Sequence, residues 1–342
     1  MTWIMISFEI ARFVTILILS TLSLMLVLDR FEPTEEKDSS YAYALENMSI
    51  PDFNFAAVGD WACTSNTNNT VNNIINSHPQ LVLGLGDFAY GHNVKCWFKL
   101  VDPIDHNMRI VMGNHEHKIY TSNTTSYPSP ERLKQYMNHF NLSKEFYSFD
   151  YENVHFIAMS TEIPFKRDTE QYKFVVNDLQ KAVKDPNIKW IVVFYHQVAY
   201  TSPSYLKSIP AIRDTYHPIF QKHGVDLILQ GHLHNYQRSY PIEYNPENSA
   251  KPFITDNVKT NYHNPKGQIF TIVGTGGAAV IHNFTGSSAP YTSIQFNAFG
   301  FLNLHVIHNG TMLVGDFHDN DGTIKDHFTI TKSGNKKEEN NN

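Results

Sequence analysis

The sequence carries little charge and no excess of positive charge, which limits the partners it can bind. Charged residues make up 18% of the 342 residues, and 33 aspartates and glutamates outnumber 27 lysines and arginines, for a formal net charge of −6. A mildly acidic chain lacks the basic surface with which proteins bind a phosphodiester backbone, so no nucleic-acid partner is expected. Hydrophobic residues make up 42% of the chain, which is typical of a globular protein and not of a disordered one.

Cysteine is also scarce, because the chain has only Cys63 and Cys96. Both follow predicted strand ends, in loops that would share one edge of a sheet. In an oxidising compartment we expect the two to form a disulfide bond, and the alternative is a pair of free buried thiols. Neither cysteine is among the candidate metal ligands described below, which argues against a soft-metal thiolate site.

The apolar stretch near the N-terminus is shorter than a spanning helix needs. Sixteen uncharged residues lie between Arg12 and Asp29, whereas a membrane-spanning helix takes about 20. Followed by a polar run, this stretch predicts that residues 1–29 are a signal anchor or a cleaved signal peptide. No A-x-A-like cleavage site follows, which favours an uncleaved anchor with the main body outside the cytoplasm.

Other features agree with an extracytoplasmic protein, either membrane-anchored or secreted. The chain has six N-x-[ST] glycosylation sequons, each weak by itself, at Asn47, Asn68, Asn123, Asn141, Asn283 and Asn309. Residues 30–50 are predicted to be a solvated linker, residues 51–331 a single domain, and residues 332–342 a disordered tail.

Within the predicted domain, strands alternate with helices and then give way to hairpins. Buried strands are predicted at 53–60, 81–87, 109–116, 189–196 and 225–234, and helices at 70–79, 131–140, 168–185 and 211–224. Hairpin strands are predicted at 146–161, 268–277, 300–310, 311–322 and 323–332, with a tight turn at Asn309 and Gly310. This order predicts a mixed α/β domain of two packed sheets with helices outside.

Polar residues follow five of these strands at the same topological position. The side chains concerned are Asp60, Asp87, Tyr90, Asn114, His196, His232 and His234. Because functional groups gather at the carboxyl ends of strands in α/β sheets, we expect these seven side chains to lie together. An aspartate after a strand is often a helix N-cap, but that explanation does not cover five strand ends at once. Glycines just before the polar residues, at positions 59, 86, 113 and 231, allow the backbones to crowd one point.

The donor types predict a centre with two metals. Seven side chains exceed what one four-coordinate zinc ion takes, and one carboxylate can bridge two cations. Oxygen ligands combined with imidazoles suit iron, zinc or manganese, and a phenolate from Tyr90 favours a hard trivalent ion. Two metals about 4 Å apart are the usual arrangement for in-line displacement at phosphorus.

The ordered motifs "GDWA", "GDFAY", "GNHE", "VFYH" and "GHLH" resemble the metal-binding motifs of purple acid phosphatases of the tartrate-resistant type, within the calcineurin-like metallophosphoesterases. The resemblance spans Asp60 to His234 and extends to the glycine-rich "VGTGGA". It implies a four-layer αββα sandwich of two mixed β-sheets flanked by helices. Tyr90 is the diagnostic residue, because most metallophosphoesterases have a histidine ligand where this chain has Ala62.

The resemblance also implies a role for each candidate residue. The ferric site is similar to one formed by Asp60, Asp87, Tyr90 and His234, and the site for a divalent ion (Fe, Zn or Mn) to one formed by Asp87, Asn114, His196 and His232. His115 is similar to the outer-sphere catalytic histidine that contacts the substrate phosphate. A second outer-sphere histidine is not assigned, and the candidates are His92, His117 and His217. Tyr200 and Tyr205 are candidates for the mouth of the site.

The implied activity is hydrolysis of phosphate monoesters by a metal-bound hydroxide, at acidic to neutral pH, on small phosphorylated substrates. Two alternatives stay open: a phosphodiesterase or nucleotide hydrolase on the same centre, and a non-catalytic cell-surface binding module. A binding module could lose ligands freely, whereas this chain keeps all seven. No oligomeric state is predicted.

Overall fold

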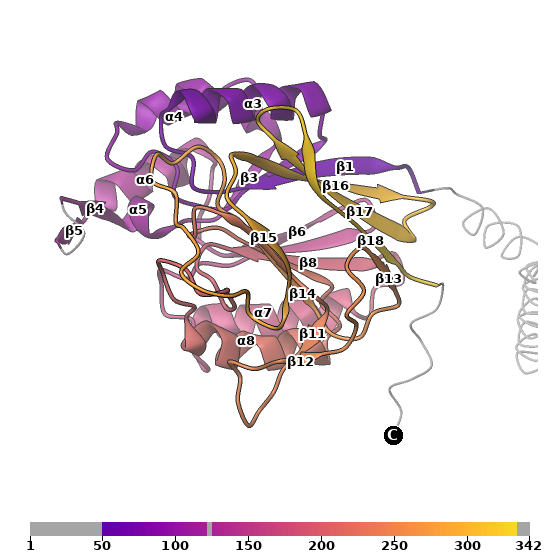
Figure 1. Ribbon diagram of the computed structural model, residues 1–342. Coiled ribbons are helices and arrows are strands. Elements are labelled where there is room, and N and C mark those ends of the chain that lie inside the picture. The colour runs from indigo at the N-terminus through magenta and orange to yellow at the C-terminus, as the bar shows by residue number, and fades with distance from the viewer. Residues whose placement is uncertain (1–49, 122–124, 334–342) are drawn as a thin grey trace, which may run out of the picture. The chain divides into compact units, whose positions relative to one another are not determined.

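The computed structural model describes residues 50–121 and 125–333, which form two β-sheets with helices outside them (Figure 1). The predicted signal segment at 1–29, nearly all of the predicted linker at 30–50 and most of the predicted tail at 332–342 lie outside these residues, so those boundaries stay predictions. Within the described ranges, no helix combines the length and the apolar character needed to cross a bilayer.

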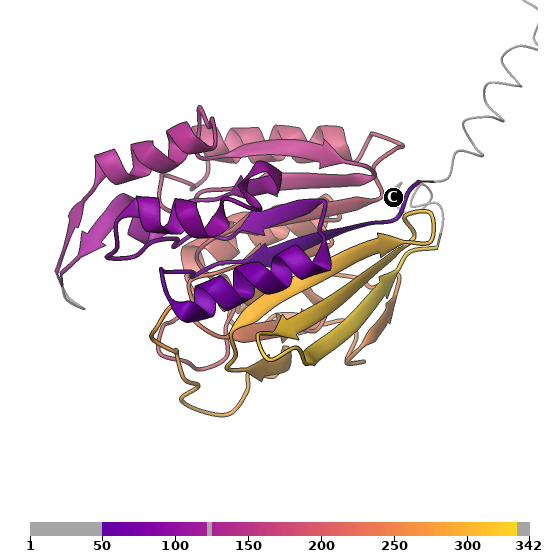
Figure 2. The ribbon, with the colours of Figure 1, turned by 90° about the horizontal axis from the view of Figure 1, so that it is seen from above.

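The first sheet joins strands from the two ends of the described chain. In spatial order it consists of β13 (Asn261–His263), β18 (Ile324–Thr331), β17 (Met312–Asp319), β16 (Gly300–Ile307), β1 (Phe53–Val58), β2 (Leu81–Gly84) and β3 (Met108–Ile110). The strands β1, β2 and β3 are parallel, whereas β16 runs antiparallel to β1. Figure 2 shows this pairing of the indigo N-terminal strand with the yellow C-terminal strands. The sheet is therefore mixed.

The second sheet is mixed as well. In spatial order it consists of β15 (Thr292–Phe296), β10 (Tyr236–Ser239), β14 (Ile269–Val273), β9 (Leu227–Gln230), β8 (Trp190–Tyr195), β7 (Val154–Ala158) and β6 (Tyr147–Tyr151). The four strands β7, β8, β9 and β14 are parallel, and antiparallel strands flank them.

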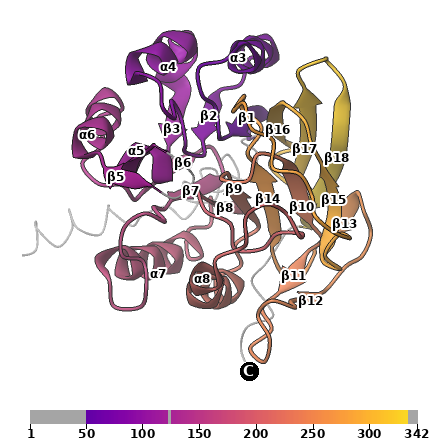
Figure 3. The same ribbon diagram turned by 60° about the vertical axis from the view of Figure 1, so that its left-hand side comes forward.

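Helices cover the outer sides of the two sheets, which confirms the predicted αββα layering (Figure 3). The longer helices are α3 (Ser65–Ser77), α4 (Val94–Val101), α6 (Pro130–His139), α7 (Glu170–Ala182) and α8 (Pro210–Lys222). On one side lie α3 and α4, and on the opposite side lie α7 and α8. Shorter elements are η1 (Asp105–Asn107), α5 (Asn114–His117), β4 (Lys118–Tyr120), β5 (Ser126–Pro128), β11 (Ile242–Glu243) and β12 (Phe253–Ile254).

The strand β8 shows how the layers pack. Alternate side chains of a strand point to opposite faces of its sheet. Trp190, Val192 and Phe194 belong to the large core that includes the residues between the sheets. Ile191 and Val193 belong to a second core, shared with apolar side chains of α7 and α8. Because both faces are covered, the strand is apolar throughout, as its sequence predicted.

The predicted helices and the cores of the predicted strands are present, but residues 114–116, predicted to end a strand, begin the helix α5, and the short strands β4, β5, β10, β11, β12, β13 and β15 were not predicted. The helix predicted at 70–79 starts earlier, at Ser65, because the Thr64 side chain caps it by accepting a hydrogen bond from the Thr67 N–H. The helix α4 was not predicted, since eight residues are too few for a clear helical period. A disulfide bond joins Cys63, in the loop after β1, to Cys96 in α4.

A histidine that lies between two carboxylates predicts a pH dependence of stability. His155 on β7 contacts two carboxylates, with Nδ1 2.6 Å from Asp150 Oδ1 and Nε2 2.9 Å from Asp178 Oδ2. Burial alone would lower the pKa of His155, but the two carboxylates raise it above its ordinary value. With a raised folded-state pKa, the stabilisation is complete below the unfolded pKa of about 6.5 and is lost as the pH rises through the folded pKa.

We therefore expect the Asp178→Asn variant to lose stability mainly at low pH. The free energy of unfolding should fall by roughly 1–2 kcal/mol at a pH of about 5.5, and by less at a pH of about 9. Chemical denaturation of both proteins at the two pH values measures this difference. An equal loss at both pH values would show that the charge on His155 is not involved.

Candidate metal centre

The strand order brings the candidate residues to one place. The strands β1, β2 and β3 are neighbours in the first sheet, and β8 and β9 are neighbours in the second. Two backbone hydrogen bonds join strand ends here: the Gly59 N–H, after β1, donates across the two sheets to the carbonyl of Val273 at the end of β14 (2.9 Å), and the Gly231 N–H, after β9, donates to the His196 carbonyl after β8 (3.0 Å). The carboxyl ends of strands from both sheets therefore meet at one point.

Three of the candidate side chains form a first group. The Tyr90 hydroxyl lies 2.9 Å from Asp60 Oδ1 and 2.8 Å from His234 Nε2. His234 Nε2 also lies 3.3 Å from Asp60 Oδ1. A phenol oxygen, a carboxylate oxygen and an imidazole nitrogen thus converge within hydrogen-bonding distance of one another.

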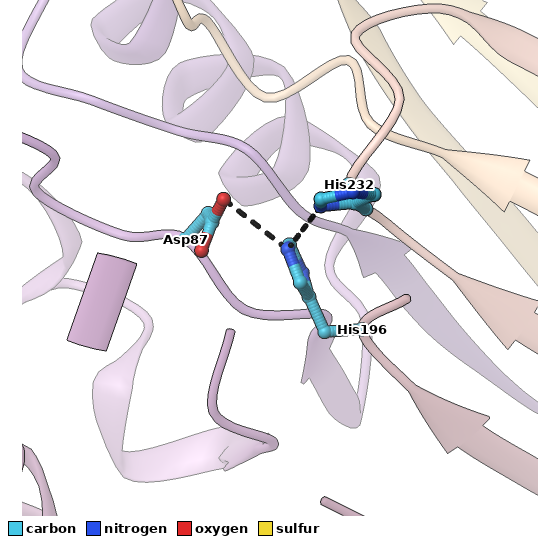
Figure 4. A group of neighbouring side chains, drawn as sticks. All are labelled: Asp87, His196 and His232. Atoms are coloured by element: carbon cyan, nitrogen blue, oxygen red, sulfur yellow. Dashed lines mark hydrogen bonds and ion pairs between the residues drawn. The ribbon is translucent and has the colours of Figure 1, made fainter. Parts of the chain in front are cut away.

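Three further side chains, Asp87, His196 and His232, form a second group and point toward one another (Figure 4). His196 Nε2 lies 3.2 Å from Asp87 Oδ2 and 3.2 Å from His232 Nδ1. The ligand atoms of these three residues lie within 4.8 Å of one another, close enough to hold a metal ion. The Asp60 carboxylate connects the two groups, because its Oδ2 accepts the backbone N–H of His232 at 2.7 Å.

Asn114 supplies the seventh candidate ligand. Its Nδ2 donates to the Tyr120 hydroxyl at 3.1 Å, which orients the amide. Its Oδ1 is buried and has no hydrogen-bond partner among the described residues. A buried carbonyl oxygen left without a partner is costly, and a bound cation would satisfy it. The residues present therefore fit a metal centre.

The backbone at this point is strained. Asp60, Asp87, Tyr90 and His232 all adopt the left-handed conformation, with φ of 60°, 55°, 49° and 69°. Residues other than glycine rarely adopt it, and each such residue costs about 1 kcal/mol or more. Four of the seven candidate ligands thus have a conformation that the rest of the fold imposes on them.

Glycines make room for these side chains. A Cβ atom on Gly113 would overlap Asp87 Oδ1, and one on Gly231 would lie 2.8 Å from Asp60 Oδ2. Gly86 has a φ of +88°, and a Cβ there would lie 2.7 Å from His196 Nδ1. Side chains at these positions would therefore displace the candidate ligands.

The electrostatics of the second group favour a positive charge. Burial alone would lower the pKa of His196, but the Asp87 carboxylate raises it to about 10. Burial and the neighbouring His196 lower the pKa of His232 to about 3. A proton on His196, beside Asp87, is thus favoured, whereas a proton on His232 is disfavoured. A metal cation would supply the positive charge in place of the proton on His196.

The electrostatics of the first group keep Tyr90 protonated when no cation is bound. Burial and the Asp60 carboxylate raise the pKa of Tyr90 well above its ordinary value. The phenol therefore donates to Asp60 in the metal-free protein. Ionising it here requires a strongly acidic cation, which agrees with a trivalent ion.

Glu116 is a site residue that the sequence analysis missed. Its carboxylate is fully buried and accepts the backbone N–H groups of Asp87 (2.8 Å), Phe88 (2.9 Å) and Gly113 (2.8 Å). These bonds hold the loops after β2 and β3 together. A glutamate at the third position of a helix start often bonds backward in this way, and that pattern was available in "GNHE".

His115 lies at the open side of the centre. Its backbone N–H donates to Asp87 Oδ1 at 2.9 Å, and its ring packs at a tilt between Tyr90 and Tyr120, with centroids 4.2 Å and 4.6 Å away. Its side chain is 21% exposed, more than those of Asp87 and His196. The imidazole can therefore reach a molecule bound at the centre. Tyr120 is a second residue that the sequence analysis did not single out.

The remaining candidate residues lie outside the two groups of candidate ligands. His217 is buried in α8, where it pairs with the Tyr200 hydroxyl at 2.7 Å, so neither residue lines the mouth of the site. His117 pairs with Glu145 at 2.7 Å. His92 is exposed and is not among the side chains of the two groups. Tyr205 is 61% exposed, and its ring stacks on His282, which in turn stacks on His234.

Comparison with known proteins agrees with this geometry. The family model for calcineurin-like phosphoesterases matches residues 53–236, which is more than half of the chain. A solved structure of a purple acid phosphatase from yellow lupin (Lupinus luteus) seeds superimposes with a TM-score of 0.66 at 23% identity, covering 83% of this chain and 54% of that one. At this identity the superposition shows a shared fold.

Among curated proteins, the chain is 27% identical to acid phosphatase type 7 of Mus musculus, over 73% of this chain and 60% of that protein. It is 26% identical to the probable inactive purple acid phosphatase 1 of Arabidopsis thaliana, over 73% of this chain and 43% of that protein. The chain thus spans about half the length of these relatives. The family match, the fold and the gathered ligands lead to one conclusion: this chain belongs to the calcineurin-like phosphoesterase family, alongside relatives named purple acid phosphatases.

Proposed function

We propose that this protein hydrolyses phosphate monoesters at a centre of two metals, one ferric and one divalent (Fe, Zn or Mn). The ferric ion would be held by Asp60, Asp87, Tyr90 and His234. The divalent ion would be held by Asp87, Asn114, His196 and His232. The observation that supports the proposal is that Asp60, Tyr90 and His234 form one group and Asp87, His196 and His232 an adjoining one. Asn114, which follows the strand β3, adds a buried oxygen without a partner among the described residues.

When bound, the two cations supply Lewis acidity at the phosphoryl oxygens and lower the pKa of water near them. The protein's own contribution is to orient the ligands and to handle protons at the open side. His196 donates from Nδ1 to the Leu85 carbonyl at 2.8 Å, which leaves its Nε2 lone pair for a cation. The His115 imidazole donates a hydrogen bond to the phosphate and assists departure of the alcohol.

The proposed location is outside the cytoplasm, at acidic to neutral pH, with the protein secreted or held by its N-terminal segment. The Cys63–Cys96 disulfide supports an oxidising compartment. Of the six sequon asparagines, those at 68, 141, 283 and 309 lie in described ranges and are exposed, as glycosylation requires. The other two, Asn47 and Asn123, lie outside the described residues.

A visible absorption spectrum tests the proposal directly. We expect a violet charge-transfer band from tyrosinate bound to iron, which disappears in the Tyr90→Phe variant, and about two metals per chain. Tyr136→Phe is the matched control, since Tyr136 is a buried tyrosine in α6 outside the seven candidates. A colourless protein with two divalent metals would contradict the ferric assignment.

Two alternative functions predict different experimental results. For a phosphodiesterase or nucleotide hydrolase on the same centre, kcat/KM would be higher for a bis-aryl phosphodiester than for the matching aryl monoester. A non-catalytic binding module is favoured by one observation, that a relative carries the name probable inactive purple acid phosphatase. A protein purified without metal, and unable to bind it on addition, would support that alternative.

A further inference from the structure

The ring of His234 is held by a segment far along the chain. His196 uses the Leu85 carbonyl, in the loop that precedes Asp87. His234 instead places its Nδ1 against the Val280 carbonyl, in the loop after β14. Because a carbonyl can only accept, Nδ1 carries a proton, and Nε2, which faces Asp60 and Tyr90, is the nitrogen left to bind a cation. This contact therefore sets the tautomer that a metal ligand needs.

His282 holds the same residue from a second side. Its ring stacks on the ring of His234, with centroids 3.9 Å apart and planes 14° apart. Its Nδ1 accepts the backbone N–H of His234 at 3.1 Å, and its own backbone N–H donates to the His234 carbonyl at 3.3 Å. His282 is only 7% exposed, so these contacts are shielded from water.

The loop that carries Val280 and His282 is itself fixed to the loop after β8. Ser204 and Phe284 form an antiparallel bridge between the two loops. Tyr205 stacks on His282, with centroids 5.1 Å apart, so that three rings lie in a row from the surface to the metal centre. The Asn235 side chain also donates to the His282 carbonyl at 2.8 Å.

We propose that Val280, His282 and Tyr205 form a clamp that positions His234, with His282 as its central positioning residue. The inference rests on the proposed function, because His234 is assigned there to the ferric site. The Val280 carbonyl sets the tautomer, and the His282 ring sets the plane of the imidazole. Residues that orient a metal-ligating histidine contribute about 10–100-fold to metal affinity.

Zinc titration of the metal-free full-length chain, in competition with a chromophoric chelator, tests the clamp without any measurement of turnover. We expect His282→Ala to weaken one of two zinc sites by about 10–100-fold and to leave the other unchanged. His282→Phe keeps a ring and His282→Asn keeps a side-chain acceptor, so each should recover part of the loss. His318→Ala is the matched control, because His318 stacks on Phe301 with centroids 5.3 Å apart.

The outcomes separate the clamp from the proposed function. The clamp would be overturned if His234→Ala lost one zinc site while His282→Ala and His282→Phe both kept the wild-type zinc affinity. The clamp would also be overturned if His282→Ala weakened both zinc sites to the same extent as the control His318→Ala does. Wild-type affinity in His234→Ala would instead overturn the ligand assignment on which the proposed function rests. Should His282→Ala fail to fold, His282→Phe, which preserves the packing, still decides between these results.

Discussion

Replacing Asp87 with asparagine is expected to remove bound metal and phosphatase turnover together. Asp87 is fully enclosed, and its Oδ2 lies 3.2 Å from His196 Nε2 while its Oδ1 accepts the His115 N–H at 2.9 Å. Burial raises the pKa of Asp87, but His196 and His115 outweigh that effect and hold the pKa well below its ordinary value. The residue is therefore a carboxylate in the folded protein, and the amide would remove the negative charge that the two proposed cations share.

The expected size of this effect follows from the proposal that Asp87 is a ligand of both metals. Metal content should fall from about two per chain to one or none, and kcat/KM for an aryl phosphate monoester by about 10³-fold or more. Metal analysis and steady-state kinetics on the same sample measure both quantities. Asp316→Asn is the matched control, because Asp316 pairs with His327 at 2.7 Å on strands β17 and β18. A variant that kept two metals and full turnover would show that Asp87 is not a ligand.

Replacing His115 with alanine is expected to separate turnover from metal binding. The contact of this residue with Asp87 Oδ1 is made by its backbone N–H, which alanine retains. The imidazole packs between Tyr90 and Tyr120 and is not among the side chains gathered in the metal-binding group. The variant should therefore keep both metals and lose only what the imidazole does for the reaction.

We expect kcat of His115→Ala to fall by about 10²–10³-fold with metal content unchanged, as is typical when one transition-state donor is removed. His117→Ala is a neighbouring control, since His117 pairs with Glu145 outside the ligand groups. The measurement is kcat and KM across the pH range, together with metal analysis. Full turnover of His115→Ala at every pH would refute the catalytic role. A loss of metal in this variant would show that His115 has a structural role at the centre.

These two results would also decide whether the centre is catalytic. One relative is named an acid phosphatase and another a probable inactive purple acid phosphatase, although both match this chain over the same share of its length. Family membership alone therefore does not predict turnover. Loss of kcat with retained metal in His115→Ala would be direct evidence for chemistry at the centre, which a binding module would not show.

The sequence by itself determined the five buried strands that precede the candidate ligands, and the polar residues that follow them. Apolar runs such as the one at 189–196 predicted buried strands, because a strand covered on both faces is apolar throughout. A polar residue at the end of each run predicted where the ligands would lie, because parallel strands end at a common edge. The position of Asp87 and Tyr90 at the end of β2, for example, was sufficient to identify them as candidates.

Only the tertiary structure decided how the candidate ligands divide into two groups and which contacts orient them. The contact of Tyr90 with His234 joins segments 144 residues apart, and the contacts of His234 with Val280 and His282 join loops 46 and 48 residues apart. Local periodicity encodes the shape of a segment but not which distant segment it meets. The unpaired Asn114 oxygen has the same origin, because burial and the absence of a partner depend on every chain segment packed around it.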